Sequence, residues 1–186
     1  MTPQAFKQQN QDTDSAAGAR RCVGKTYHET SECQLRALCG ALDFGQDTGR
    51  ILELQRFLFS PWGDYPIPAQ PRYPSFIGDD HSPYEYSLAL SGNSAELRIL
   101  FEAQAETPSP FANQEAARAV NERLAERYVV DFARLKRVED LFLVANPRPP
   151  LSLWHAVCLN PGRPPEFKIY LNPAAQGREQ APELLA

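Results

Sequence analysis

The sequence lacks long hydrophobic runs and any excess of positive charge. No stretch of its 186 residues approaches the roughly 18 apolar residues that a membrane-spanning helix needs. The N-terminus also has no apolar signal-peptide core. We therefore expect a soluble, cytoplasmic protein without a membrane partner. Lys and Arg number 19 against 23 Asp and Glu, a net charge of −4, which argues against a nucleic-acid partner because such proteins usually carry a basic excess.

The cysteines and histidines show none of the spacings of a metal site. Cys22, Cys33, Cys39 and Cys158 form no CxxC pair, and the three histidines are far apart. A zinc site is therefore not expected. With 42% hydrophobic and 23% charged residues, the chain has the composition of one globular domain with its own core.

Proline is abundant and clustered. The 17 prolines make up about 9% of the chain, against about 5% in average proteins. Six of them fall in residues 60–83, which also contain many aromatic residues and follow no helix or strand period. This segment is too apolar for a flexible linker, so we expect an ordered loop. Residues 1–26 are polar and predict a loose N-terminal tail.

Hydrophobic periodicity predicts alternating helices and hairpins. The predicted helices cover residues 31–42, 49–58, 113–128 and a segment starting at 131. The first has a capping-box spacing at Ser31 and Gln34, and Asn113 and Asp131 are candidate caps of the last two. Two β-hairpins are predicted, 84–90 with 95–103 and 151–159 with 167–171.

Each predicted strand has an apolar face and a face with ionisable or phenolic groups, because side chains alternate along a strand. Glu85, Arg98, Lys168 and Tyr170 all fall on the polar faces. Two interpretations fit: a sheet packed on helices with its polar face in water, or a barrel with outer helices and a polar interior. In the second, Arg98 and Lys168 would hold a diphosphate, Tyr170 would donate a hydrogen bond and Glu85 would act as a base. Periodicity does not decide between them.

Three motifs resemble the dimethylallyltryptophan synthase type of aromatic prenyltransferase. SFIGDDHSPYEYSLAL (75–90) contains the D-x-[ST]-P-x-E-x-S segment that opens a strand in that family. AELRILFEA (95–103) carries the arginine of the next strand, and FKIYLNP (167–173) matches a later K-x-Y strand followed by proline. The motifs follow the family's order over roughly residues 27–176.

The resemblance implies an α+β fold, the αββα prenyltransferase barrel, with antiparallel strands inside and helices outside. Only about the first two repeats are present, since members of the family are roughly twice as long. Residues 27–186 are therefore expected to form the N-terminal part of such a barrel, from a fragment, a truncated reading frame or a split gene. About four strands cannot close the barrel, so a complementary chain or self-association would have to complete it.

The donor implied by the resemblance is dimethylallyl diphosphate or a related prenyl diphosphate. Arg98, Lys168 and Tyr170 match diphosphate-binding residues of the family, where positive charge stabilises the departing diphosphate. No metal or other cofactor is expected, because the family does not require Mg²⁺. The sequence also has no DDxxD-like run; Asp79 and Asp80 stand alone.

The acceptor implied is an indole or tryptophan-derived aromatic, prenylated by electrophilic aromatic substitution. Glu85 matches the catalytic glutamate that contacts the indole N–H and supports proton removal. Phe76 and Ile77 sit where backbone groups hold the polar end of the acceptor. Trp154 is a candidate pocket wall, although aromatic side chains more often pack in cores. The alternative is a non-catalytic remnant or a small α+β binding domain built on the half-barrel.

Overall fold

The computed structural model describes residues 24–92, 94–148 and 153–184. Most of the predicted N-terminal tail, and residues 151–152 of the third predicted strand, lie outside the described residues. The elements are, in chain order, α2 (Tyr27–Ala41), η1 (Gly45–Asp47), α3 (Thr48–Phe59), η2 (Trp62–Asp64), β1 (Tyr84–Ser91), β2 (Ser94–Phe101), α4 (Pro110–Tyr128), α5 (Ala133–Lys136), α6 (Glu139–Phe142), β3 (Leu153–Leu159), β4 (Glu166–Leu171) and α7 (Ala181–Leu184).

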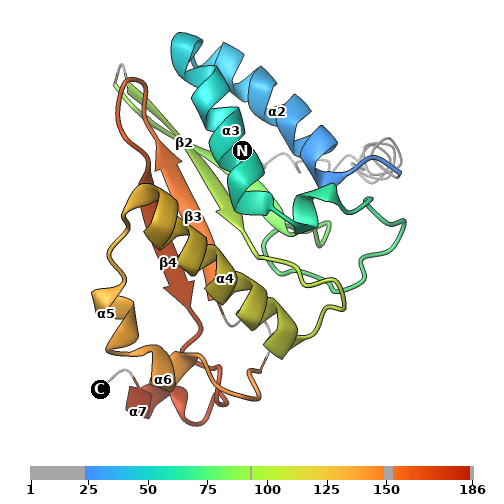
Figure 1. Ribbon diagram of the computed structural model, residues 1–186, viewed down its shortest axis with the longest axis vertical. Helices are drawn as coiled ribbons and strands as arrows, with labels where there is room; N and C mark the ends of the chain where they lie inside the picture. Colours follow the sequence, from blue (N-terminus) through green and yellow to red (C-terminus); the bar gives the residue numbers. More distant parts are fainter. Residues whose placement is uncertain (1–23, 93, 149–152, 185–186) are drawn as a thin grey trace, which may run out of the picture.

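The four strands form one antiparallel sheet in the order β1-β2-β3-β4 (Figure 1). Both predicted hairpins are therefore confirmed. The β2–β3 pairing joins them and aligns Arg98 with Cys158 and Leu100 with Ala156. β1 and β4 are the outer strands of this sheet, and neither has a second strand neighbour among the described residues.

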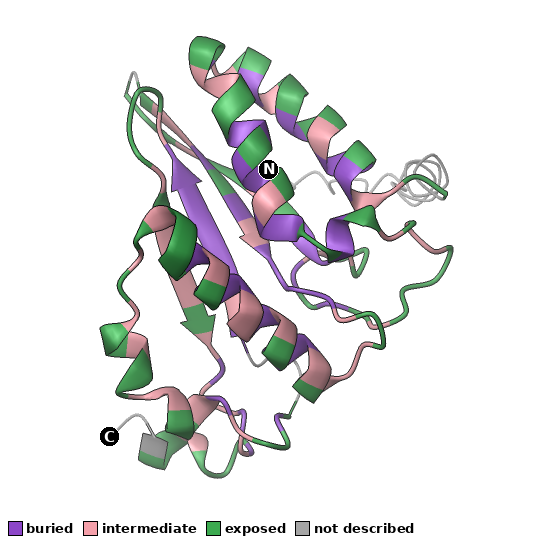
Figure 2. Cartoon of the chain, in the orientation of Figure 1, coloured by how far each residue is buried: buried purple, intermediate pink, exposed green. Residues whose placement is uncertain are grey.

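The apolar face of the sheet packs against the long helices. Leu97, Ile99 and Phe101 of β2 are fully buried, and Leu153 and Val157 of β3 are almost fully buried. They share a core with apolar residues of the helices: Leu35 and Cys39 of α2, Leu54 and Leu58 of α3, and Ala117, Val120 and Leu124 of α4. Burying an aliphatic side chain of this size contributes about 1.5–3 kcal/mol. Figure 2 shows buried residues along β3 and on the sides of the helices that face the sheet.

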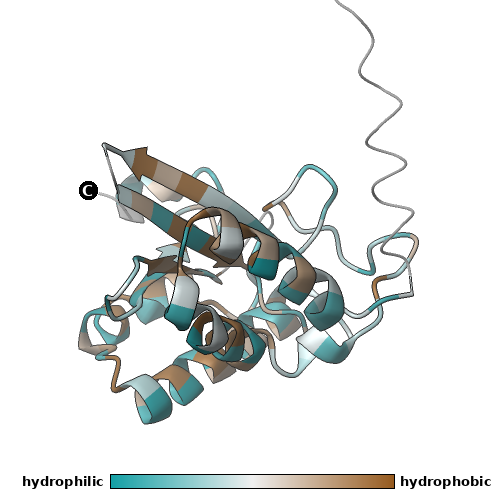
Figure 3. Ribbon diagram, turned by 90° about the horizontal axis from the view of Figure 1, so that it is seen from above, coloured by the Kyte–Doolittle hydropathy of each residue, from teal (hydrophilic) through white to brown (hydrophobic). Residues whose placement is uncertain are grey.

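The three long helices α2, α3 and α4 lie together on one side of the sheet (Figure 3). The arrangement of outer helices, an antiparallel sheet and a second sheet face without long helices matches the predicted α+β architecture. No helix in the described part of the chain has the length and apolar character that crossing a membrane would require.

The cap of the first helix lies five residues before the predicted one, so the capping box expected at Ser31 and Gln34 is wrong. Thr26 is the cap: its hydroxyl accepts from the backbone N–H of Glu29 at 3.0 Å, and the Glu29 carboxylate accepts from the Thr26 N–H at 2.7 Å. Ser31 is buried one turn into α2, where its hydroxyl accepts a 2.8 Å hydrogen bond from Gln55 of α3. That contact joins the two helices.

The expected caps of the later helices also needed correction. Ser109 caps α4, with Pro110 at its first position, where proline's missing N–H costs nothing. Asn113 lies inside α4, and its side chain accepts from the N–H of Ala105 instead. The helix expected from Asp131 is two four-residue helices, α5 and α6; Asp131 accepts from the N–H of Ala133, just inside α5.

The proline-rich segment 60–83 is tied to the start of α2 by backbone hydrogen bonds. Ile67 N–H donates to the carbonyl of Lys25 at 2.7 Å, and Tyr27 N–H donates to the carbonyl of Tyr65 at 3.2 Å. The expectation of an ordered loop is therefore confirmed. The loop leads directly into β1 and so places the segment around Phe76 next to the sheet.

Candidate functional site

The polar face of the sheet brings four of the predicted site residues onto one surface. Cross-strand pairing aligns Glu85 of β1 with Leu100, Leu100 with Ala156, and Ala156 with Lys168 of β4. By the usual spacing of strands, this row spans about 14 Å from its first to its last residue. Arg98 belongs to the neighbouring row, and Tyr170 to the row on the other side.

The two cations on this face each form an ion pair with an acidic residue of the same strand. Arg98 Nε donates to Glu96 Oε1 at 2.5 Å, and Lys168 Nζ lies 3.6 Å from Glu166 Oε1. The hydrogen bond from Arg98 lowers the pKa of Glu96. Exposed ion pairs of this kind add little to stability, so they do not prevent either cation from binding a more highly charged anion.

Cys158 lies between these cations on the middle of the sheet. It is directly opposite Arg98 in one ladder and Glu166 in the other, and it is almost fully buried. Interaction with the Cys158 sulfur is the largest cause that raises the pKa of Lys168. Arg98 and Lys168 therefore lie on the two strands that flank Cys158.

Glu85 is exposed on β1, and its side chain makes no hydrogen bond or ion pair with another described residue. Its carboxylate is therefore available to accept a hydrogen bond from a ligand. Tyr170, at the other end of the surface, is 48% exposed. Its partner residue in the β3–β4 ladder is Trp154.

The loop that carries Phe76 and Ile77 is held in shape by His81. Its Nδ1 lies 3.0 Å from the carbonyl oxygen of Ser75, and its backbone N–H donates to the carbonyl of Gly78. The side chain of Phe76 is 54% exposed, whereas Ile77 is buried. The Ile77 N–H already makes a long 3.4 Å hydrogen bond to the Ser75 hydroxyl. The loop thus presents Phe76 outward on a fixed backbone.

Glu102 is a further residue of this face that the sequence did not assign to the site, and Trp154, the candidate pocket wall, lies on the same face. Glu102 follows β2 and is only 4% exposed. Burial raises its pKa to about 7, while the neighbouring donors Ser75 and Trp154 oppose that rise. The sequence did contain a signal for Glu102. It lies two residues after Leu100, so alternation along the strand puts its side chain on the same face as Arg98.

One cavity next to the sheet lies on its helix side. It has a volume of about 540 Å³ and opens between the segment Val130–Leu135 and strands β3 and β4. Lys168 and Tyr170 reach its rim at the outer edge of β4, but Glu85 and Arg98 do not line it. This cavity therefore does not unite the predicted site residues.

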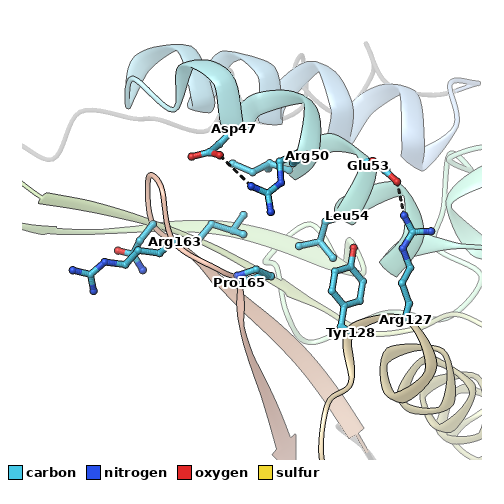
Figure 4. Close-up of a pocket in the computed structure, with 11 residues that line it drawn as sticks. Asp47, Arg50, Glu53, Leu54, Arg127, Tyr128, Arg163 and Pro165 are labelled. Atoms are coloured by element: carbon cyan, nitrogen blue, oxygen red, sulfur yellow. Dashed lines mark hydrogen bonds and ion pairs between the residues drawn. The ribbon is translucent and has the colours of Figure 1, made fainter.

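A smaller cavity of about 120 Å³ lies between α3, the end of α4 and the β3–β4 loop (Figure 4). Arg50, Arg127 and Arg163 line it, together with Asp47 and Glu53. Arg127 donates to Glu53, and Arg50 lies 3.8 Å from Asp47. Two of its three arginines are thus already paired with carboxylates. Separately, no group of three His, Cys, Asp or Glu side chains in the described residues is placed to hold a metal ion.

Solved structures of three prenyltransferases are similar to the chain. A 6-dimethylallyltryptophan synthase from Micromonospora olivasterospora, in complex with DMASPP and Trp, is 34% identical with a TM-score of 0.80, covering 87% of this chain and 46% of that one. A 5-dimethylallyltryptophan synthase from Streptomyces coelicolor, in complex with the same ligands, is 29% identical with a TM-score of 0.81, covering 87% and 46%. Prenyltransferase PriB, with L-tryptophan and dimethylallyl thiolodiphosphate, is 31% identical with a TM-score of 0.76, covering 86% and 46%.

The chain spans about half the length of these proteins. Its α+β architecture is therefore the corresponding part of the prenyltransferase barrel. A comparison with curated protein sequences gives no significant match. The sequence pattern of the family described as tryptophan dimethylallyltransferase matches residues 54–183. That range includes both hairpins and every site residue predicted from the sequence, and the chain belongs to this family.

Proposed function

We propose that this chain forms one wall of an aromatic prenyltransferase site, which transfers a dimethylallyl group from its diphosphate to an indole acceptor related to tryptophan. The observation that carries the proposal is the shared row of Glu85 and Lys168 on a sheet face without long helices. A carboxylate at one end and cations at the other suit the two substrates of such a reaction. The ligands named for the similar structures, DMASPP and tryptophan, support the same assignment.

The donor end of the site consists of Arg98, Lys168 and Tyr170. In the reaction, the bond between the allylic carbon and the diphosphate oxygen breaks, and the bonding electrons leave with the diphosphate. Arg98 offers a planar fork for two phosphate oxygens, and Lys168 a compact charge. Both stabilise the charge that builds on the leaving group. Tyr170 donates a hydrogen bond to it and presents its ring to the allyl cation.

The acceptor end consists of Glu85 and the backbone of Phe76 and Ile77. The Glu85 carboxylate accepts a hydrogen bond from the indole N–H, which makes the ring more electron-rich as the cation approaches. A ring carbon then forms a bond to the allyl cation, and the proton on that carbon passes to a base, the role proposed for Glu85, which restores aromaticity. Phe76 and Ile77 hold the polar end of the acceptor. In this proposal the cations that bind the diphosphate are protein side chains, and no metal ion takes part.

The four strands supply only one side of such a site. Water would quench an allyl cation, so the reaction needs an enclosed cavity. The outer strands β1 and β4 are the places where further strands of a barrel would pair. We infer that a complementary chain or a second copy of this chain encloses the polar face.

Prenyl transfer by the purified chain tests the proposal. The chain is incubated with dimethylallyl diphosphate and L-tryptophan, alone over a range of concentrations and together with the remaining half of the Micromonospora enzyme. A prenylated product detected by mass spectrometry, and lost in Glu85→Gln, is expected. A soluble monomer that binds neither the stable analogue dimethylallyl thiolodiphosphate nor L-tryptophan would instead support a non-catalytic domain built on the half-barrel.

A further inference from the structure

Glu102 and Trp154 are neighbours on the polar face of the sheet, on adjacent strands. The β2–β3 ladder aligns Phe101 with His155, and continuing it by one residue puts Glu102 opposite Trp154. The next ladder aligns Trp154 with Tyr170. One row therefore leads from the buried carboxyl through the indole to the phenol of the proposed donor end.

Both side chains carry a buried polar atom without a partner. Glu102 Oε2 and Trp154 Nε1 are inaccessible to solvent, and neither has a hydrogen-bond partner among the described residues. One is an acceptor and the other is a donor. An unpaired buried polar atom destabilises the fold, and two such atoms on neighbouring side chains remove both costs by bonding to each other.

Ser75 connects the same carboxyl to the acceptor loop. It is fully buried, and its hydroxyl, like the Trp154 indole, is one of the neighbouring groups that lower the pKa of Glu102. Ser75 also precedes Phe76 and is tied to His81. Glu102 therefore touches the loop of the acceptor end and the strand of the donor end at once.

We propose that Glu102 is a positioning residue, which orients the Trp154 indole as an aromatic wall of the site beside Tyr170. In this proposal the indole directs its N–H toward Glu102 and turns its π-face toward the space over the polar face of the sheet. An aromatic face at this position would contact the allyl group and stabilise the positive charge that develops on it. The wall role rests on the function proposed above, whereas the contact between Glu102 and Trp154 does not.

Few of the groups that surround the Glu102 carboxyl can change their charge. Ser75 and Tyr73 face it from the loop before β1, and Trp154 faces it from β3. Burial raises the pKa of Tyr73 above its usual value of 10, and the Glu102 charge adds to that rise. Near neutral pH, Glu102 is therefore the group in this cluster whose charge changes.

The indole N–H resonances of the ¹⁵N-labelled chain test the contact without any substrate. The sequence has two tryptophans, so two indole signals are expected, and Trp62→Phe assigns them. The Trp154 signal should shift with pH with a midpoint near 7, and Glu102→Gln should abolish that shift. The Trp62 signal, from an indole packed on Phe59, reports that the fold is intact. A Trp154 signal that does not titrate, or that titrates equally in Glu102→Gln, would overturn the proposal.

Ligand binding then tests the wall. Trp154→Ala should bind dimethylallyl thiolodiphosphate about tenfold more weakly, the value of one good aromatic contact, while Trp154→Phe retains most of the affinity. Glu102→Ala should resemble Trp154→Ala, and Glu106→Gln, an exposed glutamate nearby, is the control. Unchanged affinity in Trp154→Ala would overturn the wall role. If the wild-type chain binds no analogue, the proposed function fails, and the pH titration alone decides the contact between Glu102 and Trp154.

Discussion

Glu85 and Lys168 lie in the same cross-strand row of the sheet, at its two outer strands. Only Leu100 and Ala156 separate them in that row. The proposed base for the acceptor and the proposed cation for the diphosphate thus lie at opposite ends of one surface. This relationship leads to separate predictions for the two ends.

Replacing Glu85 by glutamine should stop acceptor turnover and leave donor binding intact. The amide keeps the size of the side chain but is a far weaker acceptor for the indole N–H, so kcat/KM for L-tryptophan should fall by about 10²–10⁴-fold in the assembled enzyme. The Kd for dimethylallyl thiolodiphosphate should stay the same. Glu122→Gln, on an exposed position of α4, is the matched control. Equal turnover in Glu85→Gln and wild type would refute the assigned role.

Replacing Arg98 or Lys168 by alanine should weaken diphosphate binding. Each variant should raise the Kd for dimethylallyl thiolodiphosphate by about tenfold or more, because a charge-assisted hydrogen bond is lost. Glu96→Gln should lower the Kd, since it releases Arg98 from its ion pair. Isothermal titration calorimetry at two salt concentrations measures these effects. Lys136→Ala, an exposed lysine of α5, should change nothing; a loss as large in this control would show nonspecific attraction.

Much of the fold could be predicted because strand alternation and helix periodicity are local signals. Both hairpins and the polar faces of their strands appear where the pattern placed them. The residues at which the helices begin were harder to predict from the sequence. The side chain of Asn113 could cap a helix, but its oxygen accepts a hydrogen bond from the Ala105 N–H instead. The local preference of asparagine for a cap position is real, but here the contact with Ala105 uses the side chain instead.

The site was only partly predictable for the same reason. Alternation places Arg98 and Lys168 on polar faces, but it does not say that Cys158 lies between them. That depends on the register of β2 with β3, which pairs residues far apart in the sequence. Glu102 and Trp154 each have an ordinary local setting, and only this register shows that they are neighbours.

Two buried groups should give the free energy of unfolding opposing pH dependences. Burial lowers the pKa of His155 from 6.5 to about 3, so stability rises with pH from about 3 to 6.5 as the unfolded state releases its proton. Burial raises the pKa of Glu102 from 4.5 to about 7, so its contribution is complete below 4.5 and is lost as pH rises to about 7. Each slope approaches about 1.4 kcal/mol per pH unit.

Between pH 4.5 and 6.5 these two slopes should largely cancel. Glu102→Gln should then gain stability with pH more steeply than wild type over this range, and His155→Gln should lose it. Urea denaturation at several pH values measures the difference. The same pH dependence in all three proteins would mean that neither group is buried in the way described.

Replacing Phe59 by alanine should destabilise the junction of α3 with the sheet. Phe59 is fully buried, with its ring centroid 4.3 Å from that of Trp62 and 5.5 Å from that of Phe101. The cavity left behind should lower the free energy of unfolding by about 3–5 kcal/mol. Phe111→Ala, at a position 47% exposed on α4, should cost about 0.5 kcal/mol or less. Similar losses in both variants would contradict the packing described for Phe59.

The central claim, that the polar face of the sheet binds the prenyl diphosphate, is tested most directly by an NMR titration of the ¹⁵N-labelled chain with dimethylallyl thiolodiphosphate. The chain offers a second cationic location as an internal comparison, the cavity lined by Arg50, Arg127 and Arg163. The account predicts saturable shifts at Arg98 and Lys168 and none at those three arginines. Shifts confined to the three-arginine cavity, or no saturable shift at all, would contradict it.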